Sequence, residues 1–239
     1  MNTFLFLCAG RSSRMQGTVS DKILALVGQT TVASLGFQSF IQTGLFQKAI
    51  ILFRDLAQRR ALNQIFAPLC PSGFTLQWVE GGGERQDSVF NGLCAAGMET
   101  ELVAIHDAAR PLISPETILG VMHLARETGA AVAAHPVADT IKKAVPNPEN
   151  PLHTTLLDLD RRSLWAMETP QAFQFDRIFD AYQRIRQEGI SITDDTAALQ
   201  HHGQPVALYH NPLPNPKITN PSDLAYVEAL LRLRHESAC

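Results

Sequence analysis

Three short polar stretches hold the residue types that could bind and move a phosphate group. The first, "CAGRSSRM" (8–15), follows an apolar run directly and combines a glycine with two arginines. Glycine lets a backbone come close to a ligand, and arginine matches phosphate with a planar fork of N–H donors. Arg14 and, further along, Lys22 supply positive charge where a polyphosphate would lie. The spacing is neither GxGxxG nor GxxxxGK[ST], so a polar loop between two core elements remains the alternative.

The other two stretches also have a chemical and a purely structural interpretation. In "EGGGERQDSV" (80–89), three glycines let backbone N–H groups crowd around a planar ligand, and a helix start brings Arg85 and Ser88 to the same place. The alternative is a tight strand-to-helix turn. In "HDAARP" (106–111), Asp107 could hold a hard cation or a substrate hydroxyl. The alternative is a structural ion pair between Asp107 and Arg110.

Other kinds of site find little support in the sequence. The eight histidines show no HxxxH or HExxH spacing, and we find no convincing Ser-His-Asp or Cys-His set. The four cysteines form no CxxC pair, which favours a reduced, cytoplasmic setting over disulfides or zinc. Cys8 and Cys94 lie in apolar stretches and are expected to be small core residues.

The elements that must position these stretches alternate regularly in the first part of the chain. We predict strands at 3–9, 48–53, 74–80, 101–107 and 130–137, with helices at 30–43, 54–66, 84–97 and 114–129 between them. Ser114, Pro115 and Gly129 are the start and stop signals of the last helix. This alternation predicts a mostly parallel sheet covered by helices on both faces. Ligands of such sheets bind at the carboxyl ends of strands, where the three polar stretches lie.

The pattern changes after residue 138. Two strand-like segments, "DTIKKAV" and "TTLLDLD", are joined by "PNPENP", whose three prolines make a stiff turn. We expect a protruding β-arm at about 138–160, of a kind that often serves dimerisation. Helices near 175–188 and 193–202, the strand "PVALYH" (205–210) and a helix from about 220 follow. We interpret residues 1–239 as a single domain.

Composition limits the partners. The chain has 239 residues, 45% of them hydrophobic, and a net charge of −3. This balance does not favour a nucleic-acid partner or an anionic membrane surface. No apolar run approaches the roughly 20 residues that a membrane span needs. An anionic ligand must therefore be held by local clusters of Lys and Arg.

Seven stretches, taken in order, resemble the 2-C-methyl-D-erythritol 4-phosphate cytidylyltransferase family of isoprenoid precursor biosynthesis. To the three above they add "DTIK" (139–142), "DRRSLWAMETPQAF" (160–173), "TDDTAAL" (193–199) and "KITNPSDL" (217–224). The resemblance implies a Rossmann-like three-layer nucleotidyltransferase fold whose arm builds a homodimer. It also implies transfer of the cytidylyl group of CTP to 2-C-methyl-D-erythritol 4-phosphate, with Mg²⁺ or another divalent cation. The products would be 4-diphosphocytidyl-2-C-methyl-D-erythritol and pyrophosphate.

The same resemblance implies a role for individual residues. The catalytic cations on the triphosphate would be Arg14, Lys22 and Lys217. The nucleotide would be bound by Cys8, Ala9, Gly10, Gly82 and Ser88. The methylerythritol phosphate would be bound by Asp107, Arg110, Thr140, Arg161, Thr169 and Thr193. Thr140 and Arg161 would reach into the neighbouring subunit's site, and Asp107 is also a candidate metal ligand.

Three positions depart from the family pattern. Ser12 stands where the family usually has a second glycine, and Gly83 stands where an acidic residue is common. The family usually reads Pro-Lys-Gln where this chain has Asp21-Lys22-Ile23, in a loop that is one residue longer. Asp21 is expected to offset part of the charge of Lys22.

Three other functions remain as alternatives. Ribitol-5-phosphate cytidylyltransferases share much of this layout, but they often have Ser-Val at Ala108-Ala109. An NAD-dependent oxidoreductase needs a GxGxxG after the first strand and an acid ending the second, and here "IILFR" ends in arginine. A nucleotide-binding protein without catalytic activity is the third, and measurable turnover would exclude it.

Overall fold

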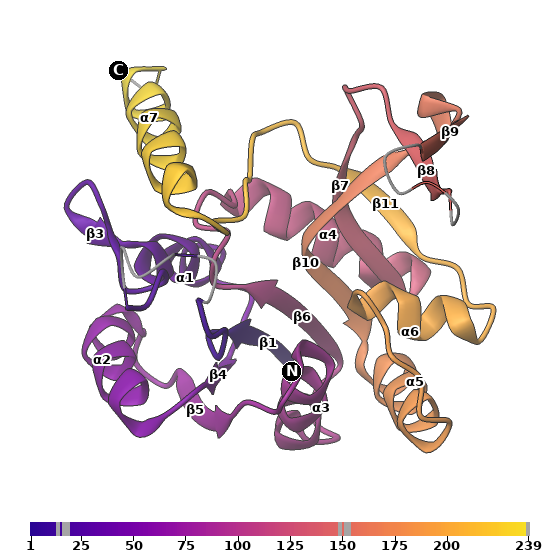
Figure 1. The fold of residues 1–239 in the computed structure, drawn as a ribbon. Coiled ribbons are helices and arrows are strands. Elements are labelled where there is room, and N and C mark those ends of the chain that lie inside the picture. The colour runs from indigo at the N-terminus through magenta and orange to yellow at the C-terminus, as the bar shows by residue number, and fades with distance from the viewer. Residues whose placement is uncertain (13–14, 16–19, 148–149, 151–153, 238–239) are drawn as a thin grey trace.

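The computed structural model describes residues 1–12, 15, 20–147, 150 and 154–237. A seven-stranded sheet with the order β11-β7-β10-β6-β1-β4-β5 runs through it (Figure 1). The strands are β1 (Asn2–Leu7), β4 (Lys48–Phe53), β5 (Thr75–Glu80), β6 (Leu102–Asp107), β7 (Ala130–Pro136), β10 (Trp165–Gln174) and β11 (Ala207–His210). β10 runs antiparallel to both of its neighbours, and the other pairs in the sheet are parallel. The expected mostly parallel sheet is confirmed.

Helices cover both faces of this sheet because its strands are apolar on both sides. Phe4 and Phe6 of β1 belong to one core cluster, which includes residues of α1 (Val32–Gln42), α2 (Leu56–Phe66) and α4 (Pro115–Thr128). Leu5, the residue between them, belongs to a second cluster with α3 (Arg85–Ala96), α5 (Phe175–Gln187) and α6 (Asp195–His201). Successive strand residues point to opposite faces, so this division confirms the three-layer arrangement.

Capping interactions are present at several of the predicted helix ends. The Asp55 carboxylate accepts a hydrogen bond from Gln58 N at the start of α2, and Ser114 Oγ accepts one from Thr117 N at the start of α4. Gly129 ends α4 in the left-handed conformation that glycine adopts readily. These local signals depend on residues within one turn of each other, which explains why the sequence shows them.

One central strand was not predicted. β10 holds Glu168, Thr169 and Pro170 in its middle, and its pairing with β7 changes register between Met167 and Gln171. Polar residues and proline disfavour a central strand, so the sequence pattern hid it. Beyond this sheet, β2 (Leu26–Val27) and β3 (Thr30–Thr31) form a small hairpin that was not predicted either.

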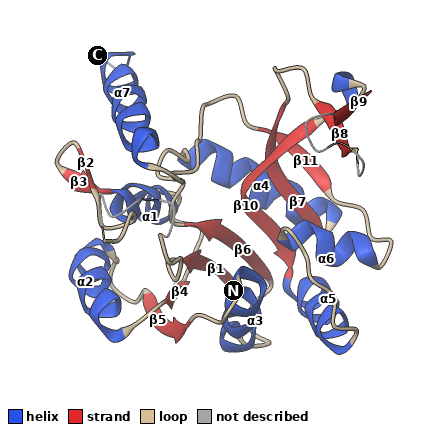
Figure 2. Cartoon of the chain, viewed as in Figure 1, coloured by secondary structure: helices blue, strands red, loops and turns tan. Residues whose placement is uncertain are grey.

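The segment between β7 and β10 carries the expected hairpin. β8 (Lys142–Pro146) and β9 (Thr154–Asp158) pair antiparallel in a sheet of their own, at a distance from the central sheet (Figure 2). Every residue of both strands is exposed. Among the arm residues that the structure describes, the exposed large apolar side chains are Ile141, Val145, Leu156, Leu157 and Leu159.

The remaining elements are the short 3-10 helices η2 (Ala67–Leu69) and η3 (Arg161–Ser163), and the C-terminal α7 (Pro221–Ser237). α7 packs Leu224, Val227 and Leu231 against a small cluster that contains Val32. The expectation for Cys94 was wrong: it lies on an exposed face of α3, whereas Cys8 is buried as expected. Within the part of the chain that the structure describes, none of the helices has the length and apolar character to cross a membrane.

Candidate functional site

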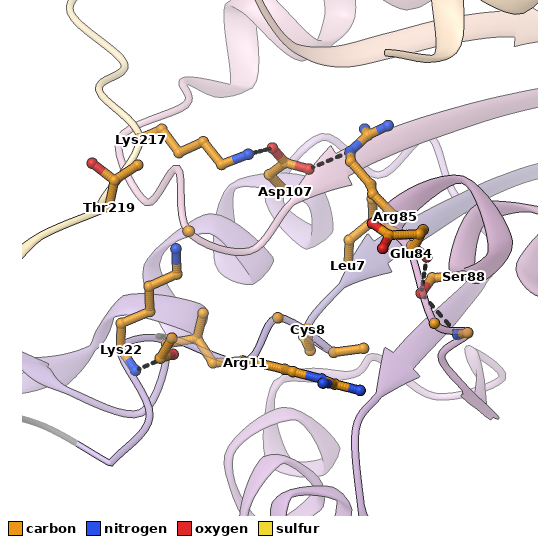
Figure 3. A pocket seen from close by; sticks show the side chains of 17 residues that line it. Leu7, Cys8, Arg11, Lys22, Glu84, Arg85, Ser88, Asp107, Lys217 and Thr219 are labelled. Atoms are coloured by element: carbon orange, nitrogen blue, oxygen red, sulfur yellow. Dashed lines mark hydrogen bonds and ion pairs between the residues drawn. The ribbon is translucent and has the colours of Figure 1, made fainter. Parts of the chain in front are cut away.

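A cavity opens at the carboxyl ends of β1 and β6, where the predicted polar stretches meet (Figure 3). Its walls come from the segment after β1, the glycine turn before α3, the end of β6, and residues of the segment 217–219. The sequence-predicted residues that line it are Cys8, Ala9, Gly10, Lys22, Gly82, Ser88, Asp107 and Lys217. The tertiary fold therefore brings together residues that lie more than two hundred positions apart in the chain.

Asp107 is held between two cations in this cavity. Its Oδ1 lies 3.2 Å from Arg85 Nε, and its Oδ2 lies 2.5 Å from Lys217 Nζ (Figure 3). Burial by itself would raise the pKa of Asp107, but Arg85 and Lys217 outweigh it and hold the pKa well below its ordinary value. The carboxylate is therefore ionised at neutral pH. The alternative of an Asp107–Arg110 ion pair is wrong, because Arg110 instead donates to the carbonyls of Asn215 and Met167.

Arg85 connects this carboxylate to a second, deeper one. Its two terminal nitrogens each lie 2.8 Å from one oxygen of Asp195, whose side chain is fully buried. Tyr182 Oη donates to the same carboxylate at 2.6 Å. Sequence reasoning placed Arg85 near the site without a role for it. Its position in the first turn of a helix after three glycines was the available signal. Asp195 lies in the stretch "TDDTAAL" (193–199), in which only Thr193 was given a role.

His106 joins Thr169 and Arg110 to the end of β6. Its Nε2 lies 3.1 Å from the carbonyl oxygen of Arg110, which can only accept, so Nε2 bears the hydrogen. Burial lowers the pKa of His106 to about 4, so the ring is neutral and its Nδ1 accepts from Thr169 Oγ1 at 2.9 Å. Thr169 Oγ1 in turn accepts from the backbone N–H of Asp107 at 3.2 Å. The His106 ring thus connects Asp107, Arg110 and Thr169, three of the residues that are predicted to bind the methylerythritol phosphate.

The glycine turn is tight enough to exclude side chains at two positions. A Cβ on Gly82 would lie 2.2 Å from Asp87 Cβ, and one on Gly81 would lie 2.5 Å from Ala9 Cβ. Gly82 N donates to Ser88 Oγ at 2.9 Å, and Glu84 and Asp87 form a capping box at the start of α3. The two predicted nucleotide loops are therefore in direct contact through Gly81 and Ala9.

The first loop is arranged around Ser12 and Lys22. Ser12 has a φ of 52°, a left-handed conformation that favours glycine, and its Oγ accepts from Lys22 N at 3.2 Å. Lys22 Nζ donates to the carbonyl of Ile218 at 2.7 Å, next to Lys217. Asp21 turns its carboxylate to Arg54 and Gln58. The ion pair of Asp21 is with Arg54, and the expected offset of the Lys22 charge by Asp21 stays a prediction.

The remaining predicted residues lie elsewhere. Arg14 is outside the described residues. Thr140, Arg161 and Thr193 are exposed and do not line the cavity, and Arg161 Nη1 donates to the carbonyl of Ala138 in the arm. The described residues hold no group of three or more His, Cys, Asp or Glu that could bind a metal by themselves. Mg²⁺ is usually held by one or two carboxylates together with substrate phosphates, so Asp107 fits such a shared site.

Comparison with known proteins shows the family to which the chain is similar. The model of the family IspD, 2-C-methyl-D-erythritol 4-phosphate cytidylyltransferase, matches residues 3–233. A curated protein of that name from Pelotomaculum thermopropionicum is 43% identical over 234 residues, covering 95% of this chain and 92% of its own. One from Geobacillus kaustophilus is 35% identical over 239 residues and covers 96% of both chains.

Solved structures give the same result. The crystal structure of 2-C-methyl-D-erythritol 4-phosphate cytidylyltransferase from Thermus thermophilus is 28% identical, with a TM-score of 0.73 over 95% of this chain and 98% of that one. The structure of 4-diphosphocytidyl-2C-methyl-D-erythritol synthase from Anaerococcus prevotii has a TM-score of 0.82 at 22% identity, covering 97% and 98%, and supports the fold alone. The chain belongs to the 2-C-methyl-D-erythritol 4-phosphate cytidylyltransferase family.

Proposed function

We propose that this enzyme transfers the cytidylyl group of CTP to 2-C-methyl-D-erythritol 4-phosphate, releasing pyrophosphate. The observation that carries the proposal is the match to the family over residues 3–233, joined to a cavity that gathers the predicted loops. The cavity is lined by two lysines (Lys22 and Lys217), two arginines (Arg11 and Arg85) and the ionised carboxylate of Asp107. These groups meet the chemical demand of that reaction, which is to bring two polyanions together. The product, 4-diphosphocytidyl-2-C-methyl-D-erythritol, is an intermediate of isoprenoid precursor biosynthesis.

The attacking group is an oxygen of the methylerythritol phosphate. A phosphate monoester has a second pKa of about 6, so it is largely a dianion at neutral pH and needs no general base. This oxygen forms a bond to the α-phosphorus of CTP as the bond to the β-phosphate bridging oxygen breaks. The enzyme contributes by aligning the two groups and by neutralising charge. Lys22 and Lys217 serve that purpose here, together with Arg14 as the family pattern implies.

Asp107 and Lys217 exchange partners in this scheme. In the structure Lys217 Nζ lies 2.5 Å from Asp107 Oδ2. When a triphosphate enters, Lys217 turns to the phosphate, and Arg85 remains on the other oxygen of Asp107. The freed oxygen would hold Mg²⁺ together with phosphate oxygens, and the cation would supply charge neutralisation on the triphosphate.

The proposal includes a homodimer whose arms complete the sites. The described residues of the arm expose five large apolar side chains, which a water-facing hairpin would not favour. Thr140 and Arg161 lie on or beside it, outside their own chain's cavity lining. In the proposed dimer these two residues bind the substrate phosphate in the neighbouring subunit. A cytoplasmic location fits the free thiols of Cys8, Cys70 and Cys94.

The first experiment measures pyrophosphate release from CTP and Mg²⁺ with three acceptor conditions. Methylerythritol phosphate is expected to support turnover, whereas ribitol 5-phosphate and the absence of acceptor are expected to give only background. Turnover with ribitol 5-phosphate instead would move the chain to that sister activity, despite Ala108-Ala109 at the end of β6. No release with either acceptor would reject the proposed reaction.

A further inference from the structure

A buried polar network lies behind the loop that follows β1. Asp21 and Gln58 are its centre, and their exposed fractions are 5% and 2%. Gln58 Nε2 donates both to Asp21 Oδ2 at 2.6 Å and to the carbonyl of Cys8 at 3.0 Å. Gln58 Oε1 accepts from Arg54 N at 2.7 Å. Every polar atom of the glutamine side chain is thus used, and the network joins the loop to the first turn of α2.

Arg54 adds a second anchor on the same loop. Its Nη1 donates to the carbonyl of Gly10 at 3.2 Å, and its Nη2 lies 3.3 Å from Asp21 Oδ2. The other oxygen of Asp21 accepts from Ile23 N at 3.3 Å. Asp21 therefore accepts hydrogen bonds from Gln58 and Ile23 and forms an ion pair with Arg54, and the Gln58 and Arg54 side chains also hold carbonyls of the loop.

These contacts set the direction of the loop's peptide groups. In a trans peptide the N–H points opposite to the C=O. Because the carbonyls of Cys8 and Gly10 face Gln58 and Arg54, the N–H groups of the two following residues point away from the network. Cys8, Gly10 and the residues after them line the cavity, whereas Asp21, Arg54 and Gln58 do not. An oriented pair of N–H groups is a usual way to bind an anion.

The same carboxylate also holds the chain around Lys22. On one side, Lys22 N donates to Ser12 Oγ, and on the other, Ile23 N donates to Asp21 Oδ1. The backbone that carries the lysine is thus fixed both to the loop and to the network. We propose that Asp21, acting through Gln58 and Arg54, is a positioning residue that holds the 8–10 loop and Lys22 in place for the CTP triphosphate; this rests on the proposed function.

Asp21→Asn is the sharpest test, because it keeps the size of the side chain. Asparagine has one oxygen, so its NH₂ must face either Ile23 N–H or the donors of Gln58 and Arg54, and a donor then meets a donor. We expect the KM for CTP to rise and kcat/KM for CTP thereby to fall about tenfold or more, as for a lost hydrogen bond to a charged group. The KM for methylerythritol phosphate should change little. If Asp21 acted only through its charge, Asp21→Asn would change the KM for CTP in the opposite direction. Removing a negative charge near a polyanion would lower that KM.

Variants at Gln58 and Arg54 show whether the three residues act together. Gln58→Ala should reproduce the effect of Asp21→Asn, and the double variant should lose no more than the larger single loss. Gln64→Ala, an exposed glutamine on the same helix, is the matched control and should behave as wild type. Arg54→Met changes a side chain that is 30% exposed, and it should also raise the KM for CTP.

The outcomes separate this inference from the reaction itself. If the wild-type enzyme releases pyrophosphate but Asp21→Asn has an unchanged or lower KM for CTP, the positioning role is wrong and the reaction stands. Losses that multiply in the double variant would show that Asp21 and Gln58 act by separate routes, and they would overturn it too. If the wild-type enzyme itself shows no CTP-dependent release, the proposed function fails first.

Discussion

At the scale of single residues, the site depends on groups whose charge state is set by burial and partners. Asp107 is kept ionised by Arg85 and Lys217, and His106 is kept neutral by its buried position. The neutral ring must accept from Thr169 and donate to the Arg110 carbonyl at the same time. A second proton on His106 would reverse the first of these bonds and bury a charge. The end of β6 is therefore expected to be sensitive to acid.

This sensitivity has a defined direction. The pKa of His106 is about 4 in the folded protein, below its ordinary value of about 6.5, because burial disfavours the charged form. The unfolded chain thus binds the proton first, and stability is lost as the pH falls from about 6.5 toward 4. Near pH 5 this single group should cost about 2 kcal/mol. Urea unfolding of wild type and His106→Gln at neutral pH and near pH 5 measures it.

The variant should show a smaller loss between the two pH values than wild type. His123→Gln, which replaces an exposed histidine of α4, is the control and should keep the wild-type difference. Equal losses in wild type and His106→Gln would contradict the neutral, buried assignment.

At the scale of elements, the cavity depends on how closely two loops approach. The loop after β1 and the turn after β5 touch at Ala9 and Gly81, and both lie at the carboxyl edge of the sheet. β1, β4 and β5 pair in parallel register, which brings the ends of these strands to one edge. Glycine is thus needed at Gly81 because it lets the two loops approach each other, and not only because it shapes the turn.

A methyl group at Gly81 should separate the two loops. Its Cβ would lie 2.5 Å from Ala9 Cβ and 3.0 Å from Ser88 Oγ, and neither neighbour is the end of a flexible side chain. We expect Gly81→Ala to lower kcat/KM for CTP by about tenfold or more, because a displacement of about 1 Å in a site is costly. Steady-state kinetics with varied CTP measures this.

Gly83→Ala is the steric comparison in the same turn. Its Cβ would meet nothing closer than Asp87 Oδ2 at 3.8 Å, an ordinary contact, so the loss should be clearly smaller. If the two variants lost activity equally, the contact between the loops would not be the reason.

At the scale of the whole molecule, the described residues of the arm contribute nothing to the lining of their own chain's cavity. Thr140 and Arg161 belong to a segment that leaves the sheet after β7 and returns at β10 (Figure 1). Their predicted role therefore requires a second copy of the chain. Within a symmetric dimer each arm would serve the opposite site.

Mixing two inactive variants tests that arrangement. Lys217→Ala disables the site of its own chain, whereas Arg161→Ala would disable the site of the neighbour. In a mixed dimer, one site combines the intact Lys217 of one chain with the intact Arg161 of the other. After unfolding and refolding an equal mixture, about a quarter of wild-type activity is expected, since half of the dimers are mixed and half of their sites are intact.

The parent variants, refolded separately, are the controls for this experiment. A mixture no more active than the mean of its parents would show that Arg161 acts within its own chain or not at all. Light scattering of the wild-type protein gives the mass of the assembly independently.

Much of the fold was predictable from short-range patterns. The strands at β1, β4, β5 and β6, and the caps at Asp55 and Ser114, follow from residues within a few positions of each other. An apolar run is recognisable as a buried strand because burial on both faces demands apolar residues at every position. The same runs indicated which loops would meet, because parallel strands place their carboxyl ends on one edge.

Contacts between residues far apart in the sequence could be identified only from the folded structure. β10 carries polar residues and a proline in the centre of the sheet, and Asp195 reaches Arg85 from 110 positions away. Asp107 pairs with Lys217, and Asp21 pairs with Arg54, although each has another basic residue only a few positions away. Local composition therefore determined the element types and the edge of the sheet where the chemistry lies. The partner of each charged group was decided by the tertiary structure, because burial and strand order select among contacts that are equally available to the unfolded chain.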